Sequence, residues 1–130
     1  MGPGHRTWSL ALVAAFLLAG CRTAATRDAG IRVACTISPQ PPRVGSATVT
    51  VTLSDRAAKP LTGAMVKLEA DMAHPGMAPV LVRAGESAPG SYVGHLEFTM
   101  AGDWVILVQG ALATGQRIDR QIDVKGVLPG

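Results

Sequence analysis

Apolar and polar residues alternate with a period of two in several short stretches after residue 30. In residues 47–53, Val49, Val51 and Leu53 alternate with threonines. Successive side chains of a β-strand point to opposite faces, so this alternation predicts a strand with one buried face. Similar patterns predict strands at residues 31–37, 64–70, 79–84, 91–98 and 117–124. The uninterrupted apolar run after Asp103 predicts one more at residues 103–108, buried on both sides or carrying a partner surface.

Turn-forming residues separate these stretches, and no segment has the period of an amphipathic helix. Prolines end the first stretch at residues 39–42, and glycine or proline interrupts residues 54–63, 85–90 and 99–102. About seven short strands within roughly 95 residues are typical of an immunoglobulin-like antiparallel β-sandwich. We therefore predict an all-β domain over residues 31–126, with Cys35 facing its core.

The first 20 residues have a different pattern, which predicts an export signal. Residues 1–6 include His5 and Arg6, residues 7–18 are uncharged and mainly apolar, and Leu18-Ala19-Gly20-Cys21 follows. This order resembles the lipobox of bacterial lipoproteins, in which cleavage before the cysteine precedes its lipidation. The resemblance implies a lipid on Cys21 and an extracytoplasmic protein on the periplasmic side. The alternatives are a plain transmembrane anchor, although the apolar run is shorter than the ~20 residues of a spanning helix, and a signal peptide in which Cys21 is incidental.

Residues 21–30 lack periodicity and are expected to be a flexible tether between the lipid and the domain. Removing Arg6 from the 12 basic side chains leaves 11 against nine acidic ones, a net charge of +2. This charge is weak and scattered, so we expect no nucleic-acid partner. A lipidated Cys21 would leave Cys35 without a disulfide partner in this chain.

Soft metal ligands gather in residues 71–77, Asp-Met-Ala-His-Pro-Gly-Met. Pro75-Gly76 fits the central positions of a type II turn, which would make His74 and Met77 its two ends. Met72, two residues upstream in extended chain, could point the same way as His74. Thioethers favour Cu(I), and imidazole suits Cu(I), Cu(II) or zinc. The cluster predicts a Cu(I) site, whereas the alternative is that both methionines only fill gaps in packing.

Several motifs resemble the YtkA-like domain, with a further likeness to the FixH group of membrane proteins. They are residues 63–66, the Met72–Met77 loop, Gly90-Ser91-Tyr92, and residues 98–104, which contain Met100-x-Gly102-x-Trp104. The resemblance implies an exported or lipid-anchored β-sandwich that handles copper or supports oxidase assembly. It also implies Met72, His74, Met77 and Met100 as ligands, although Met100 shares its parity with Phe98 and is expected in the core.

Other polar residues have simpler explanations. Trp104 is expected in the core, and His95 is expected to be exposed or paired with a carboxylate. Asp71 could orient the His74 ring or be a solvated turn residue. There is no glycine-rich phosphate loop and no nucleophile set near a histidine and an acid, so we expect no enzyme activity.

Two further functions remain open beside a copper-binding accessory protein. One is a metal-free module that docks on a membrane complex through the apolar strand at residues 105–108. The other is a structural envelope lipoprotein. An oxidase, a copper transporter or an efflux subunit is the expected kind of partner for the copper-binding accessory protein and for the metal-free module.

Overall fold

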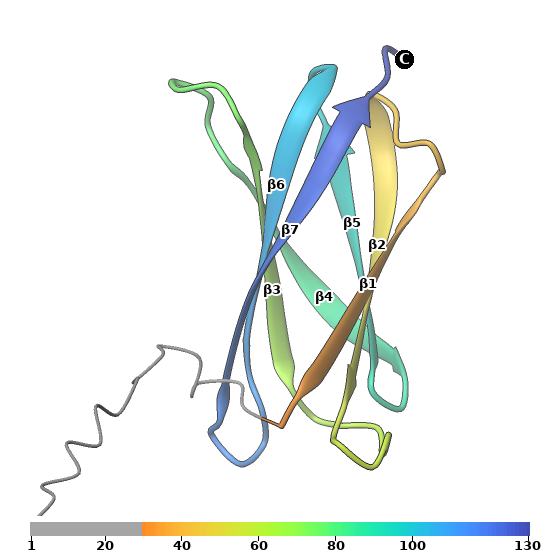
Figure 1. Cartoon of the computed structure of the whole chain (residues 1–130), viewed down its shortest axis with the longest axis vertical. Helices are drawn as coiled ribbons and strands as arrows, with labels where there is room; N and C mark the ends of the chain where they lie inside the picture. The colour runs from red at the N-terminus through yellow and green to blue at the C-terminus, as the bar shows by residue number, and fades with distance from the viewer. Residues whose placement is uncertain (1–29) are drawn as a thin grey trace, which may run out of the picture.

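The computed structural model describes residues 30–130, which form seven β-strands and no helix (Figure 1). The predicted signal, Cys21 and most of the tether lie outside these residues. Each predicted strand is present, with changed ends. The strands are β1 (Arg32–Ser38), β2 (Gly45–Ser54), β3 (Met65–Met72), β4 (Val80–Ala88), β5 (Ser91–Phe98), β6 (Gly102–Ala111) and β7 (Arg117–Val127).

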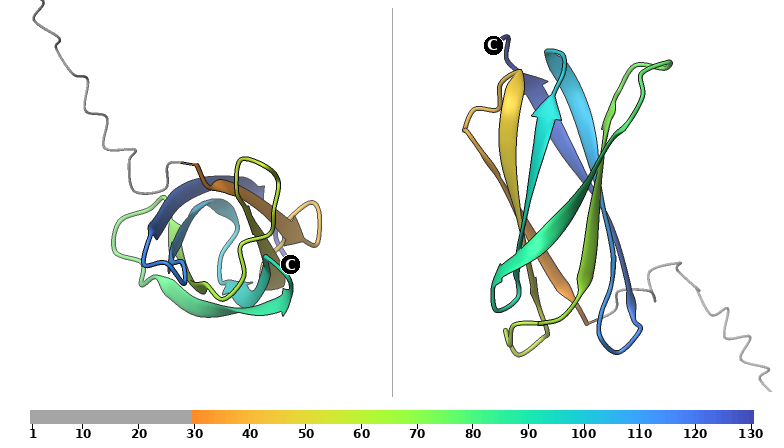
Figure 2. Two further views of the ribbon diagram at one scale, coloured as in Figure 1. Left: turned by 90° about the horizontal axis from the view of Figure 1, so that it is seen from below. Right: turned by 180° about the vertical axis from the view of Figure 1, so that it is seen from behind.

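All neighbouring strands are antiparallel, in the order β1-β2-β5-β4-β3-β6-β7. Strand β4 joins the two layers, because Val80–Ala84 pairs with β3 and the following residues pair with β5. Viewed along the strands, the layers curve around one shared interior (Figure 2). The structure confirms the predicted immunoglobulin-like antiparallel β-sandwich. It corrects the turn predicted at residues 85–90, since β4 runs to Ala88 before turning at Pro89-Gly90.

The alternating apolar residues fill the interior, as the sequence predicts. Val49, Val51 and Leu53 of β2 are fully buried, and Tyr92, Leu96 and Phe98 of β5 face them from the neighbouring strand. In the other layer, Trp104 packs against the Phe98 ring edge-on, with centroids 5.3 Å apart. Burying this apolar surface is the main favourable term in folding.

Strand β6 is buried on one face and not on both. Trp104, Ile106 and Val108 point inward, whereas Val105 and Leu107 are half-buried on the outer face. Val105 is paired in register with Asp71 of β3 and Asp123 of β7, so the three side chains lie side by side on the outer face. The apolar run therefore leaves two side chains partly open to solvent, so burial on both sides, the first of the two predicted alternatives, is wrong.

The two ends of the sandwich carry different segments. We call one the Met/His end, which carries the β3–β4 loop (residues 73–79) and the β5–β6 turn (residues 99–101). The opposite, N-terminal end carries residue 30, the β2–β3 loop (residues 55–64) and the β6–β7 turn (residues 112–116) (Figures 1 and 2). The described part of the chain contains no helix with the length and apolar character needed to span a bilayer.

Candidate metal site at the Met/His end

The β3–β4 loop has the predicted turn and exposes two of the predicted ligands. Pro75 and Gly76 lie in the turn, and Gly76 has a φ of 90°, which a type II turn requires at its second central position. His74 precedes the turn and Met77 follows it, and both side chains are exposed. Met77 retains 41% of its accessible surface. An imidazole and a thioether are thus open to solvent at the two ends of one turn.

Met72 lies in a different environment, because it is the last residue of β3 and points inward. It is 8% exposed and pairs with Trp104 of β6 across the strands. One residue later, the Ala73 amide donates to the Asp103 carbonyl at 3.1 Å, which continues the β3–β6 contact into the loop. Met72 therefore belongs to the core beneath the Met/His end, whereas His74 and Met77 lie outside it.

The β5–β6 turn explains the spacing of the Met100-x-Gly102-x-Trp104 motif. The Trp104 indole Nε1 donates to the Met100 carbonyl oxygen at 2.9 Å, so the buried indole is satisfied by the turn that precedes it. Gly102 has a φ of 123°, and a Cβ on it would lie 3.4 Å from the Met72 Cε methyl. The motif thus places Met72 directly beside the turn that carries Met100.

The Met100 side chain is 47% exposed, so the expectation that it packs in the core is wrong. Phe98 is the last residue of β5 and fills the inward position at this end. Met100 lies two residues beyond the strand, where the period of two no longer determines which way a side chain points. Its exposure leaves the thioether available as a ligand.

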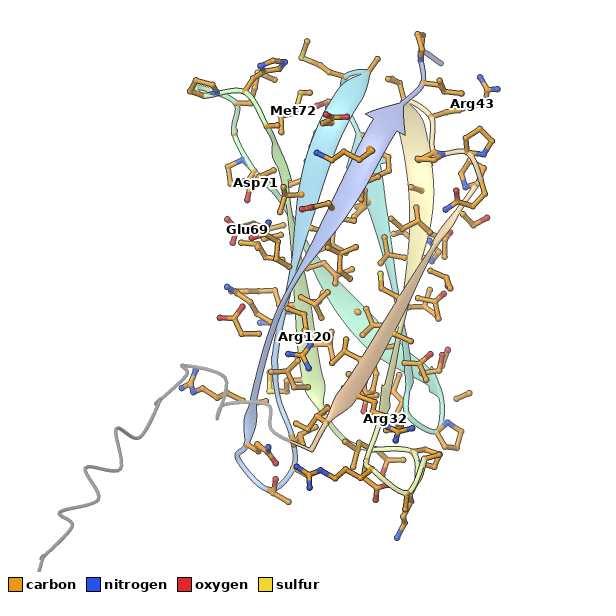
Figure 3. The ribbon with its side chains drawn as sticks, viewed as in Figure 1. Arg32, Arg43, Glu69, Asp71, Met72 and Arg120 are labelled. Carbon is orange, nitrogen blue, oxygen red and sulfur yellow. The ribbon has the colours of Figure 1, made fainter. Side chains whose placement is uncertain are left out.

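All four predicted ligands therefore lie at the Met/His end, in two groups. Met72 lies close to Gly102, which directly follows the turn that carries Met100. His74 and Met77 share the β3–β4 loop. In Figure 1 this loop, drawn in light green, leans outward from the β5–β6 turn. Figure 3 shows Met72 near the top of the strands, with Asp71 and Glu69 below it along β3. A site using both groups would draw its ligands from the loop and the turn together.

Two polar residues with open predictions, Asp71 and His95, can be placed in the structure. Asp71 lies on the outer face of β3 beside Val105, and among residues 30–130 no hydrogen bond joins it to His74. His95 is exposed as expected, but its partner is a hydroxyl, because Nδ1 lies 3.2 Å from Thr48 Oγ1.

Cys35 is half-buried on the inner face of β1, and burial raises the pKa of its thiol. The thiol therefore favours its protonated, unreactive form.

Asp103 is a positioning residue that sequence patterns did not identify. One carboxylate oxygen accepts from the Gly126 amide at 2.9 Å, and the other lies 3.8 Å from Lys125 Nζ. Its backbone carbonyl meanwhile holds Ala73. One residue thus ties β7 and the start of the β3–β4 loop to β6. Its position immediately before the buried Trp104 is a signal only when the strand pairing is known.

The chemical softness of the donor atoms determines which metal ions the Met/His end can bind. Among residues 30–130, no three His, Cys, Asp or Glu side chains gather closely enough to hold a metal ion. The donors at the Met/His end are thioethers and one imidazole, which suit Cu(I) better than hard cations that prefer oxygen ligands. The end is also open, so an ion and a partner protein could both reach it.

Comparison with solved structures finds likenesses at low sequence identity, two of which follow. The soluble domain of PmoD from Methylocystis sp. is 16% identical, with 75% of this chain and 90% of that chain covered and a TM-score of 0.48. Murine CRIg is 11% identical, with 77% and 98% covered and a TM-score of 0.42. At these values neither structure informs the function of this chain. No curated protein matches it. A family model described as YtkA-like does match residues 28–109, so the chain belongs to the YtkA-like family.

Proposed function

We propose that this chain is a membrane-anchored, extracytoplasmic copper-binding accessory protein that holds Cu(I) at the Met/His end. The supporting observation is the exposure of His74, Met77 and Met100 on two segments of the same end of a rigid sandwich. Exposed methionines on both segments are unusual for packing residues, because burial is what makes a methionine favourable in a fold. Binding, and not catalysis, is the proposed activity.

In this proposal His74, Met77 and Met100 supply the metal ligands, and Met72 supports them from below. Neutral thioether and imidazole donors suit Cu(I), and methionine is not consumed by disulfide formation outside the cytoplasm. Met72 is 8% exposed, so it reaches a metal only from the core side of the site. The shallow, open position favours transfer of the ion to or from a membrane partner, such as an oxidase, a copper transporter or an efflux subunit.

The test is a Cu(I) competition titration of the full chain in detergent against a chromogenic Cu(I) chelator. The Met77→Leu/Met100→Leu variant should bind at least tenfold more weakly than the unchanged chain, because leucine keeps the bulk and removes the sulfur. Met65→Leu is the matched control, since Met65 is 68% exposed but lies at the N-terminal end of β3. Equal competition by the unchanged chain and the double variant would end the copper proposal.

A second candidate function is a metal-free module that docks on a membrane complex. It is favoured by the outer face of β3, β4 and β6, where Val105 and Leu107 are half-buried and Leu81 is 60% exposed. In a pull-down from membranes, the unchanged chain should capture the same complex with and without a Cu(I) chelator. Loss of this capture in Leu81→Ser/Leu107→Ser would support this function. Capture that requires copper would instead support the first proposal.

A further inference from the structure

A second surface feature lies away from the Met/His end, on the outer face of the β4-β3-β6-β7 layer. It is an open groove of about 940 Å³ near the N-terminal end. Its floor includes small residues, among them Gly85, Gly110 and Ala111, and its charged side chains are three cations and two carboxylates. We call it the basic groove, and its three cations are Lys67, Arg83 and Arg117.

Two of these cations are direct cross-strand neighbours. Lys67 of β3 pairs in register with Arg83 of β4, and both side chains are exposed. Like charges at directly opposed positions of a sheet destabilise the pairing. Among residues 30–130, neither Lys67, Arg83 nor Arg117 has a hydrogen bond or ion pair from its side chain. The groove therefore holds three cations that form no ion pair within this part of the chain.

The two carboxylates that line the groove reduce its net charge to +1 but form no ion pair with its three cations. Glu86 is occupied, because its two oxygens accept from the Gly63 amide at 3.1 Å and the Gly90 amide at 3.0 Å. Asp119 lies on β7 beside Gln109, which separates it from Lys67 by one strand. An anionic ligand would thus meet three cations with no competing ion pair to break.

The other charged side chains are also unevenly distributed along the molecule, with more cations toward the N-terminal end. The N-terminal end and the groove together carry six exposed cations against three carboxylates: Arg32, Arg56, Lys59, Lys67, Arg83 and Arg117 against Asp55, Glu86 and Asp119. The half that includes the Met/His end has the opposite balance: Arg43 and Lys125 against Glu69, Asp71, Glu97, Asp103 and Asp123. Figure 3 shows part of this division, with Glu69 and Asp71 above Arg32, and with Arg43 as a cation of the upper half.

We propose that the basic groove and the adjoining N-terminal end dock on anionic phospholipid headgroups. Charge complementarity and the position of residue 30 both support this occupant, because the chain leading to Cys21 joins the domain at the same end (Figure 1). Two exposed apolar side chains of this face, Met65 at 68% and Leu81 at 60%, can enter the interface beside the cations. The inference rests on the membrane attachment in the proposed function but not on copper binding.

Docking in this way would hold the Met/His end away from the lipid. Anionic lipids attract basic side chains only within about a Debye length of the surface, so the acidic half is repelled while the basic groove is drawn in. Attachment at residue 30 alone does not select an orientation of the domain. The groove thus gives the domain one preferred orientation, in which the proposed copper ligands face a partner.

In the test, the full chain is bound to vesicles and its lysines are labelled with a water-soluble amine reagent. Mass spectrometry then measures the labelling rate of each lysine. Vesicles contain either phosphatidylcholine alone or phosphatidylcholine with about 30% phosphatidylglycerol. Lys59 and Lys67 should label several-fold more slowly on the anionic vesicles, whereas Lys125, near the Met/His end, should label equally on both. The protection should disappear in 0.5 M NaCl, because salt screens charge. Equal labelling of Lys59 and Lys67 on both vesicles would overturn the proposal.

Two charge variants complete the test. Lys67→Gln/Arg83→Gln should lose most of the Lys59 protection, whereas Arg43→Gln/Lys125→Gln removes the same charge from the other half and should keep it. Equal loss in both variants would mean that net charge alone is responsible, which also overturns the proposal. Flotation on neutral vesicles separately measures the anchor. If the chain floats only with anionic vesicles, anchoring fails while docking stands.

Discussion

The Trp104 indole Nε1 donates a hydrogen bond to the Met100 carbonyl oxygen at 2.9 Å. This bond closes the β5–β6 turn and fixes where the exposed Met100 side chain begins. The indole ring at the same time packs edge-on against Phe98 in the core. One buried side chain therefore connects the core to the proposed copper site.

Trp104→Phe should loosen this turn while keeping an aromatic ring in the core. The loss of one hydrogen bond costs about 0.5–1.5 kcal/mol, and the smaller ring adds a packing loss of similar size. Hydrogen exchange at residues 99–102 should accelerate more than exchange in the centre of β2. Phe98→Leu is the control, because it removes the ring contact and keeps the indole donor. The interpretation is wrong if both variants accelerate the turn equally.

Gly102→Ala should destabilise the domain by more than about 1 kcal/mol, because its φ of 123° lies far from the left-handed region near +57° that other residues tolerate. The new methyl would lie 3.4 Å from the Met72 Cε, in ordinary van der Waals contact, so the expected cost comes from the backbone. Gly115→Ala is the matched control, since Gly115 has a φ of 88° and open space around it. Urea denaturation should show a lower midpoint for Gly102→Ala than for the control. The reverse order would contradict the role given to this glycine.

Tyr92 joins the β5 strand to the segment that precedes β3. Its hydroxyl donates to the Leu61 carbonyl at 2.8 Å and accepts from the Ala64 amide at 3.0 Å. Tyr92→Phe leaves both partly buried groups without that partner, at a cost of about 1–3 kcal/mol. A urea midpoint that falls with an unchanged m-value would agree with this expectation. Thr48→Val, which removes an exposed hydroxyl bond to His95, should change the midpoint far less.

Glu86 should make the stability of the N-terminal end depend on pH. Hydrogen bonds from the Gly90 and Gly63 amides lower the pKa of its carboxyl group below the ordinary value of about 4.3. A carboxylate with a lowered pKa stabilises the fold above its unfolded-state pKa, and the contribution is lost as pH falls through the folded-state pKa. The Tm of Glu86→Gln should thus be lower than that of the unchanged chain at pH 7. The difference should narrow below about pH 4, and a constant difference would refute this role.

The strands and their buried faces could be predicted from the sequence. Val49, Val51 and Leu53 show the reason, because a period of two depends only on neighbouring residues of the same strand. The Pro75-Gly76 turn was equally predictable, since proline fixes φ at the first central position and glycine permits the positive φ at the second. The candidate ligands could be found in the same way, as residue types with a particular metal preference.

Local patterns fail where a position depends on contacts with distant residues. The exposure of Met100 follows from the turn that Trp104 holds, and the burial of Met72 beside it follows from the pairing of β3 with β6. The split pairing of β4 and the adjacency of Lys67 and Arg83 also come from strand register. The sequence by itself determined the β-strands, their inward faces and the soft donors. Only the tertiary structure decided which donors reach solvent and which charges become neighbours, because long-range pairing sets both.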